Sequence, residues 1–207
     1  MRTLPLLVAL SAACGSAAAY EGTARVDDER ARTWNRFAEE VFALHERSVA
    51  GREVREKTTV GRYGGEAAKH YRFREVEYYD GASGRLLSRI RWDGQDAATW
   101  HVAEVFVYDD RGRLRRDYAA IYLPWTHNAP IRTFINLHRH HDEVHAFRQF
   151  DASGEPQYER CRGRLDGQSV DLSLDPYRVG EPAMRTAAYR VCFDGLPVAA
   201  GRYLSPQ

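Results

Sequence analysis

Four histidines lie within eight residues in the second half of the 207-residue sequence. They are His138, His140, His141 and His145, and two carboxylates, Asp142 and Glu143, stand among them. Neutral imidazoles beside carboxylates can bind a divalent transition metal. His138 and His140 would share one face of a strand. The spacing matches no closed zinc motif and lacks the HExxH signature. The sequence therefore leaves two interpretations open: a metal-binding or pH-responsive patch, or an exposed polar turn.

A second group combines indole and imidazole rings. In an up-and-down series of strands, alternate turns lie at the same end, so the loops at 92–100, 124–130 and 151–156 would share one rim. That rim gathers Trp92, Trp100, Trp125, His101 and His127. Aromatic side chains at the mouth of a curved sheet can line a pocket for an apolar ligand. The alternative is that the tryptophans anchor the loops on the core or pack under a helix.

Signatures of catalysis are absent from the sequence. It has no nucleophile elbow around a serine, no glycine-rich phosphate loop and no CxxC pair. Arg160, Arg162 and Arg164 would share one strand face, either as a solvated surface or as an anion site. We therefore predict no catalytic residue and no cofactor other than a possible divalent transition metal. The sequence favours a chain that is not an enzyme and leaves the question open.

The N-terminal residues have the features of an export signal. Arg2 precedes an apolar run over 4–13, and the alanines at 17–19 offer a cleavage site before Tyr20. The run is too short to span a bilayer, and no other stretch is long and apolar enough to do so. We predict a secretory signal peptide over 1–19 and one β-rich domain over 20–207. The location is then periplasmic or secreted. A lipid anchor at Cys14 is the alternative, which would give an outer-membrane lipoprotein.

Export also decides how the remaining cysteines are interpreted. Cys161 and Cys192 are the two that follow the signal, and an oxidising compartment favours a disulfide between them. Removal of residues 1–19 takes away Arg2, which leaves 29 basic and 29 acidic residues of the 30 and 29 in the full chain. A neutral balance argues against nucleic acid as a partner. We expect an apolar small molecule or lipid, or a protein of the cell envelope.

The elements that position these groups are one helix and many short strands. Apolar residues at 34, 37, 41 and 44 form one helical stripe, which predicts an amphipathic helix over about 27–50 that ends at Gly51. From Val54 the apolar period changes towards two, and about eleven strands follow. The last two of these are expected at 185–193 and 198–204. The strongest hairpin signal is 105–122, where an Asp-Asp-Arg-Gly turn at 109–112 interrupts a β-branched and aromatic run.

The turn residues resemble a known repeat. The heptapeptide Tyr108–Leu114 reads Tyr-Asp-x-x-Gly-Arg-Leu, and Tyr79–Leu86 carries the same pattern with one insertion. Both resemble the tyrosine–aspartate (YD) repeats of large bacterial surface and toxin-shell proteins. The resemblance implies β-hairpin units in an extended sheet, and it implies no activity.

These features predict a mainly β fold, in which a long antiparallel meander forms a curved sheet, half-barrel or open barrel with the N-terminal helix packed on it. The first functional hypothesis is an exported, non-catalytic binding protein that holds an apolar ligand or a protein segment. The second is a metal-binding protein or metal-dependent enzyme that uses the histidines at 138–145. The third is a structural or assembly module of the envelope, with an exposed strand edge available for pairing.

Overall fold

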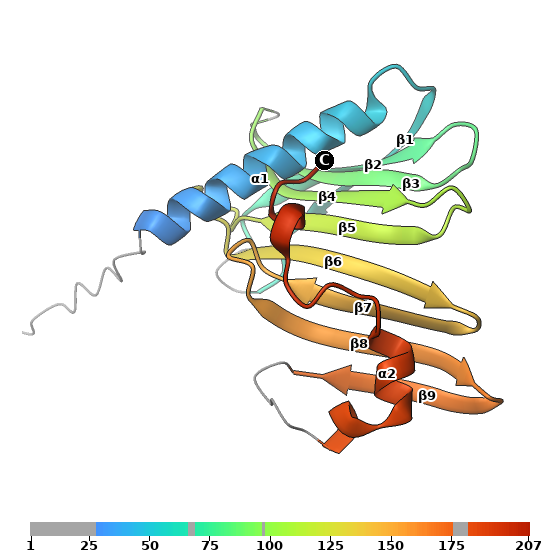
Figure 1. Ribbon diagram of the computed structural model, residues 1–207. Coiled ribbons are helices and arrows are strands. Elements are labelled where there is room, and N and C mark those ends of the chain that lie inside the picture. The colour runs from blue at the N-terminus through green and yellow to red at the C-terminus, as the bar shows by residue number, and fades with distance from the viewer. Residues whose placement is uncertain (1–27, 66–68, 97, 176–181) are drawn as a thin grey trace, which may run out of the picture.

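The fold was analysed in a computed structural model that describes residues 28–65, 69–96, 98–175 and 182–207. Nine strands form one antiparallel sheet in sequence order, from β1 to β9 (Figure 1). The strands are β1 Val54–Arg62, β2 Arg72–Asp80, β3 Leu86–Asp93, β4 Trp100–Tyr108, β5 Leu114–Ile121, β6 Arg132–His141, β7 Val144–Phe150, β8 Pro156–Leu165 and β9 Gln168–Leu174. The sheet does not close, so the predicted antiparallel meander is confirmed as an open sheet.

Three of the turns use the same aspartate chemistry. Asp80, Asp109 and Asp151 each accept hydrogen bonds through Oδ1 from backbone N–H groups further along their own turn. Each turn also has a glycine with positive φ three or four residues later, as at Gly112 with φ 75°. Aspartate satisfies the turn's free donors, and glycine adopts the left-handed backbone without a Cβ clash. An aspartate followed three or four residues later by glycine therefore does form these hairpins.

The long helix α1, Asp28–Val49, follows the predicted stripe. Trp34, Phe37, Val41 and Leu44 are all buried, with exposed fractions of 7 % or less. They face the strands β3, β4 and β5, across which α1 lies in Figure 1. The helix ends at Val49, and Gly51, with φ 68°, forms a left-handed C-terminal cap two residues later. Burial of this stripe supplies much of the hydrophobic core on this side of the sheet.

The C-terminal region is the main departure from the predicted strands. The segment expected as a strand at 185–193 contains the helix α2, Ala187–Phe193, which follows a short 3-10 turn, η1 Pro182–Arg185. Thr186 caps α2, because its Oγ1 accepts the Tyr189 N–H at 3.1 Å. The segment at 198–204 ends in a second 3-10 turn, η2 Gly201–Leu204. Both strand predictions were wrong, and the described part of the chain has nine strands, not eleven.

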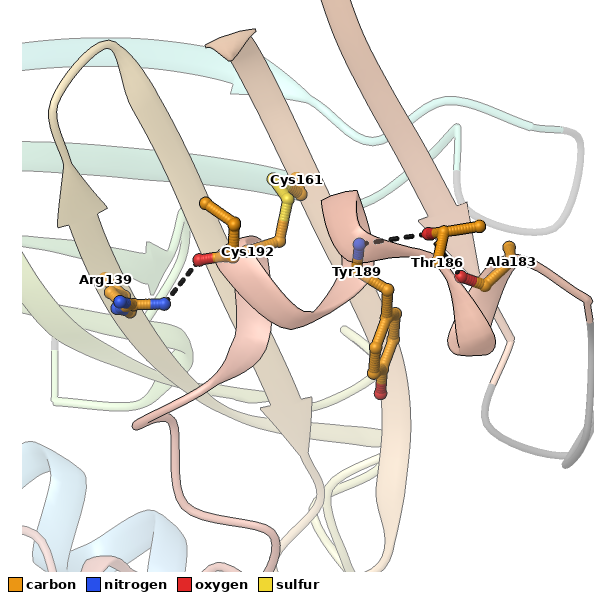
Figure 2. Close-up of a disulfide and its surroundings, with 7 residues drawn as sticks. Arg139, Cys161, Ala183, Thr186, Tyr189 and Cys192 are labelled. Carbon is orange, nitrogen blue, oxygen red and sulfur yellow. Dashed lines mark hydrogen bonds between the residues drawn. A yellow bond between two sulfur atoms is a disulfide. The ribbon is translucent and has the colours of Figure 1, made fainter. Parts of the chain in front are cut away.

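A disulfide fixes α2 to the sheet. Cys161 on β8 is bonded to Cys192 on α2, with Cα atoms 6.0 Å apart, as Figure 2 shows. The predicted disulfide is therefore present. The bond joins β8 to a helix that lies over the sheet, so no intervening strand separates the two cysteines. Arg139 on β6 adds a second attachment by donating a hydrogen bond from Nη1 to the Val191 carbonyl.

The two faces of the sheet differ in chemistry. Alternation along the strands places apolar residues such as Ile90, Val105 and Ile135, each fully buried, on the face that α1 and α2 cover. The other face, which we call the open face, carries mainly charged and polar side chains. No described helix is long and apolar enough to cross a membrane. The predicted signal peptide and Cys14 lie outside the described residues.

Candidate functional site

The site with the best combination of shape and chemistry is a groove at one end of the sheet, which we call the arginine groove. It has a volume of about 570 Å³, within the range of small-molecule pockets. The last turns of α1 form one wall, and the β2–β3 and β4–β5 turns form the other. Gln207 also lines it, because the C-terminal segment runs back from α2 to α1 (Figure 1).

The floor of the arginine groove is apolar. Leu44 comes from α1, Leu87 from β3, and Val105 and Val107 from β4. Three of these are buried, with exposed fractions of 7 % for Leu44, 6 % for Leu87 and 0 % for Val105. They lie together because α1 crosses β3 and β4 at this point and ends at Val49. A ligand seated here would therefore contact hydrocarbon below and solvent above.

The rim of the groove is cationic. Arg47, Arg52 and Arg85 are exposed and line it together with Asp80 and Asp109. Both carboxylates are already engaged in their turns, and these hydrogen bonds hold the pKa of each below its usual range. The guanidinium of Arg85 lies 5.7 Å from the centre of the Tyr108 ring.

Two contacts fix the arginines in place. A Cβ added at Gly112 would meet Arg85 Nη2 at 1.7 Å, so Arg85 rests on a surface that only glycine leaves free. Arg47 donates from Nη2 to the Pro206 carbonyl at 3.2 Å, which ties the rim to the C-terminal segment. Arg52 lies 3.8 Å from the Asp80 carboxylate, a long and exposed pairing that contributes little to stability.

The side chains of the predicted Trp/His rim do not all point to the same face of the sheet. Trp92 and Trp100 lie on the helix-covered face, where Phe42 of α1 stacks on Trp100 at 5.3 Å and meets Trp92 edge-on at 5.7 Å. His101 points to the open face because a register shift at Trp92 and Trp100 breaks the alternation there. The loops do lie at one end of the meander, and the Tyr122 ring contacts both Trp100, at 5.3 Å, and His127, at 5.2 Å.

The imidazole of His101 has an unusual environment. His101 is 1 % exposed, and its Nε2 lies 3.1 Å from Asp93 Oδ2, while its Nδ1 has no hydrogen-bond partner among the described residues. His127 packs on it with ring centres 4.7 Å apart, and burial lowers the pKa of His127. Trp125 is 45 % exposed and contacts Tyr71. That these five residues share one ligand site remains a prediction.

A second hollow, of about 620 Å³, lies at the end of the sheet that carries the loops at 124–130 and 151–156. It is lined by Trp34 and by mostly polar residues of β6 to β8 and their loops, among them Arg132, Asp151 and Glu155. Trp92, Trp100, Trp125, His101 and His127 do not line it. Its polar lining fits an apolar ligand less well than the floor of the arginine groove does.

The structure brings three of the four clustered histidines together. His138 and His140 lie on β6 and His145 on β7, all on the open face. His138 Nδ1 is 2.9 Å from His145 Nε2, and the His140 and His145 rings stack with centres 4.5 Å apart. His141 alternates away from this cluster and lies 3.4 Å from Asp142. The Asp142–Glu143 turn is tight, with φ 49° at Asp142, and the rings still converge because they stand on the strands.

The hydrogen bonds of the cluster extend across the sheet. His138 Nε2 lies 2.5 Å from Asp117 Oδ2, and Asn136 donates to the other oxygen of that carboxylate at 2.7 Å. His140 Nε2 donates to the Leu114 carbonyl at 2.8 Å. Partial burial and the two neighbouring imidazoles lower the pKa of His145 to about 4. Among the described residues, no set of three or more His, Cys, Asp or Glu converges as a metal site.

The rest of the open face carries several ion pairs. Glu77 bonds to Lys57 and Arg89, which lowers its pKa to about 2, and Arg89 also reaches Glu104 at 2.8 Å. At the other end of the sheet, Arg160 pairs with Asp171 at 2.9 Å. Arg162 also lies near Asp171, and Arg164 donates to the Gly167 carbonyl. The three arginines thus have partners of their own.

Comparison of the chain with family models, with curated proteins and with solved structures gives no match. The sites are therefore assessed on their own geometry.

The arginine groove was missed by sequence reasoning. The signal was present in part, because the meander places the turns at Asp80 and Asp109 at the same end, and a helix of 22 residues reaches that end. What the sequence did not show is where α1 crosses the strands. That crossing decides which apolar residues form the floor.

Proposed function

We propose that this is an exported, non-catalytic binding protein that holds a single-chain amphiphile, such as a fatty acid, in the arginine groove. The apolar chain of the ligand lies on Leu44, Leu87 and Val107, and its anionic head group meets the arginine rim. The observation that carries the proposal is the position of Arg47, Arg52 and Arg85 directly above an apolar floor.

Charge complementarity favours an anionic head group. The two carboxylates of the rim are held by turn hydrogen bonds, and Asp109 also has Arg113 at 2.9 Å. Arg85 has no carboxylate partner among the described residues, so its charge is available to a ligand. Guanidinium groups bind carboxylate and phosphate with matched geometry. A neutral lipid would use the floor without using the rim.

The test is a titration of the full chain with a fluorescent long-chain fatty acid, compared with the matching fatty alcohol. We expect saturable binding with one site per chain, and weaker binding of the alcohol. The variant S48W places an indole in the groove and should reduce affinity at least tenfold. R85A should reduce affinity for the acid about three- to tenfold, since an exposed charge pair contributes about 1 kcal/mol.

R164A provides the matched control, because Arg164 is an exposed arginine on β8, away from the groove. Its affinity should equal that of the unchanged protein. Absence of saturable binding, or equal affinity of the S48W variant, contradicts the proposal. Equal affinity for acid and alcohol would contradict the anionic head group alone.

A further inference from the structure

We propose that His138 and His145 form a site on the open face for one divalent transition metal ion, with copper or nickel preferred over zinc. The site is separate from the arginine groove, on the other face of the sheet. It uses two imidazole nitrogens from neighbouring strands, with water completing the coordination. The argument rests on how the first imidazole is oriented, on the distance between the two nitrogens, and on access.

Asp117 orients His138. A carboxylate only accepts hydrogen bonds, so the hydrogen on the His138 ring belongs on Nε2, which lies 2.5 Å from Asp117 Oδ2. Nδ1 then carries the lone pair and faces His145. A carboxylate on the far nitrogen of a histidine is the usual outer support of a metal ligand, because it fixes the ring and raises its basicity. Asn136 in turn holds Asp117, and Gln149 donates to Asn136 at 2.9 Å.

The spacing of the two nitrogens suits a metal ion that accepts ligands at about 90°. His138 Nδ1 and His145 Nε2 are 2.9 Å apart. With metal–nitrogen bonds of about 2.0–2.1 Å, this separation corresponds to an angle of about 90° at the metal. Ligands at 90° occupy neighbouring positions of a tetragonal or octahedral ion, as Cu²⁺ and Ni²⁺ prefer, whereas tetrahedral Zn²⁺ would need a separation of about 3.3 Å.

Access is provided by His145. The His138 side chain is 6 % exposed, but His145 is exposed on the edge of the cluster. Without metal, His145 Nε2–H donates to His138 Nδ1. Movement of that hydrogen to Nδ1 of His145 gives the other neutral tautomer and frees the second lone pair, so no proton needs to be lost. Rotation of the exposed His145 ring, with an adjustment of the His138 ring, then aims both lone pairs at one ion.

The test is a titration of tag-free, full-length protein with Cu²⁺, Ni²⁺ and Zn²⁺, followed by calorimetry and, for Cu²⁺, by electron paramagnetic resonance. We expect one Cu²⁺ per chain, nitrogen hyperfine structure from two imidazoles, and weaker binding of Zn²⁺. H145A should lose at least tenfold in affinity and one nitrogen from the spectrum. D117N should weaken binding about 10- to 100-fold while the two-nitrogen signature remains.

H141A is the matched control, because His141 lies one residue from the cluster and points away from it. Its affinity and spectrum should be unchanged. If H138A fails to fold because its ring is buried, H145A alone decides the matter, since that ring is exposed. No stoichiometric binding, binding unaffected by H145A, tighter binding of Zn²⁺ than of Cu²⁺, or equal losses in H141A and H145A would each overturn the proposal.

Discussion

Arg148 and Glu159 form an ion pair beneath α2, with Arg148 Nε 2.5 Å from Glu159 Oε1 and side chains that are 8 % and 7 % exposed. Arg148 also donates to the carbonyls of Leu196 and Pro197, and the Tyr189 hydroxyl donates to Glu159. The pair therefore connects β7 and β8 to α2 and to the segment that follows it. Charged groups so far from water are tolerated only because each has several partners.

Removal of one member of this ion pair should destabilise the folded protein. R148M leaves the Glu159 charge buried with only Tyr189 as a partner, and we expect a loss of about 3–5 kcal/mol in the free energy of unfolding. The double variant R148M/E159L removes both charges and should recover most of that loss. Urea unfolding of both variants checks this, and a double variant no more stable than R148M would contradict it.

Loss of the disulfide should destabilise the C-terminal region. Cys161 and Cys192 are 31 residues apart, and opening a loop of this length costs about 2–4 kcal/mol. The variant C161A/C192A should therefore unfold at lower urea concentration than the oxidised protein. Reduced unmodified protein is the control and should match the variant. Amide hydrogen exchange should accelerate in α2 before it does in α1, because only α2 depends on the bond.

A buried histidine on α1 should make stability depend on pH. Burial lowers the pKa of His45 to about 4, from 6.5, and its Nδ1 lies 2.7 Å from Ser88 Oγ. The unfolded chain binds a proton at a higher pH than the folded one does. The contribution is therefore fully present above about pH 6.5 and is lost as the pH falls towards 4, by about 3 kcal/mol.

The measurement is urea unfolding of the unmodified protein and of H45Q at pH 7.5, 5.5 and 4.5. Glutamine keeps a hydrogen-bonding group beside Ser88 and does not titrate. We expect the difference in stability between the two proteins to shift in favour of H45Q as the pH falls. A difference independent of pH would show that His45 is not the group responsible.

The two tryptophans of the predicted rim should behave differently when shortened. Trp100 stacks on Phe42 and also meets the Tyr122 ring edge-on at 5.3 Å, so W100A removes packing beneath α1. We expect W100A to lose about 2–4 kcal/mol, somewhat less than a fully buried aromatic residue would. W125A is the control, because Trp125 is 45 % exposed, and its change should be within about 0.5 kcal/mol. Equal losses of stability in W100A and W125A would contradict the different environments of the two tryptophans.

Local chemistry explains which parts of the fold the sequence predicts. Asp80, Asp109 and Asp151 satisfy donors within their own turns, so their effect can be read from spacing alone. The stripe on α1 is likewise a property of one helix. The segment at 185–193 was predicted wrongly because Tyr189, Val191 and Phe193 alternate like a strand. The Thr186 cap and the bond at Cys192 hold it as a helix instead.

The candidate sites depend on contacts between distant residues, which limits what the sequence predicts about them. The cluster of His138, His140 and His145 was foreseen as a group, and the alternation of β6 explains why His141 leaves it. The role of Asp117 was not foreseen, because it lies on β5 and 21 residues away from His138. The arginine groove depends on the crossing of α1 over β3 and β4, which no local pattern encodes.

The path of the segment at 205–207 back to α1 has a consequence for the order of folding. Each strand pairs only with its neighbours in the chain, so the sheet can grow one hairpin at a time as synthesis proceeds. The hydrogen bond from Arg47 of α1 to the Pro206 carbonyl instead joins residues 159 positions apart in the chain. We therefore expect this bond to form only after the strands between the two residues have paired, late in folding rather than at its start.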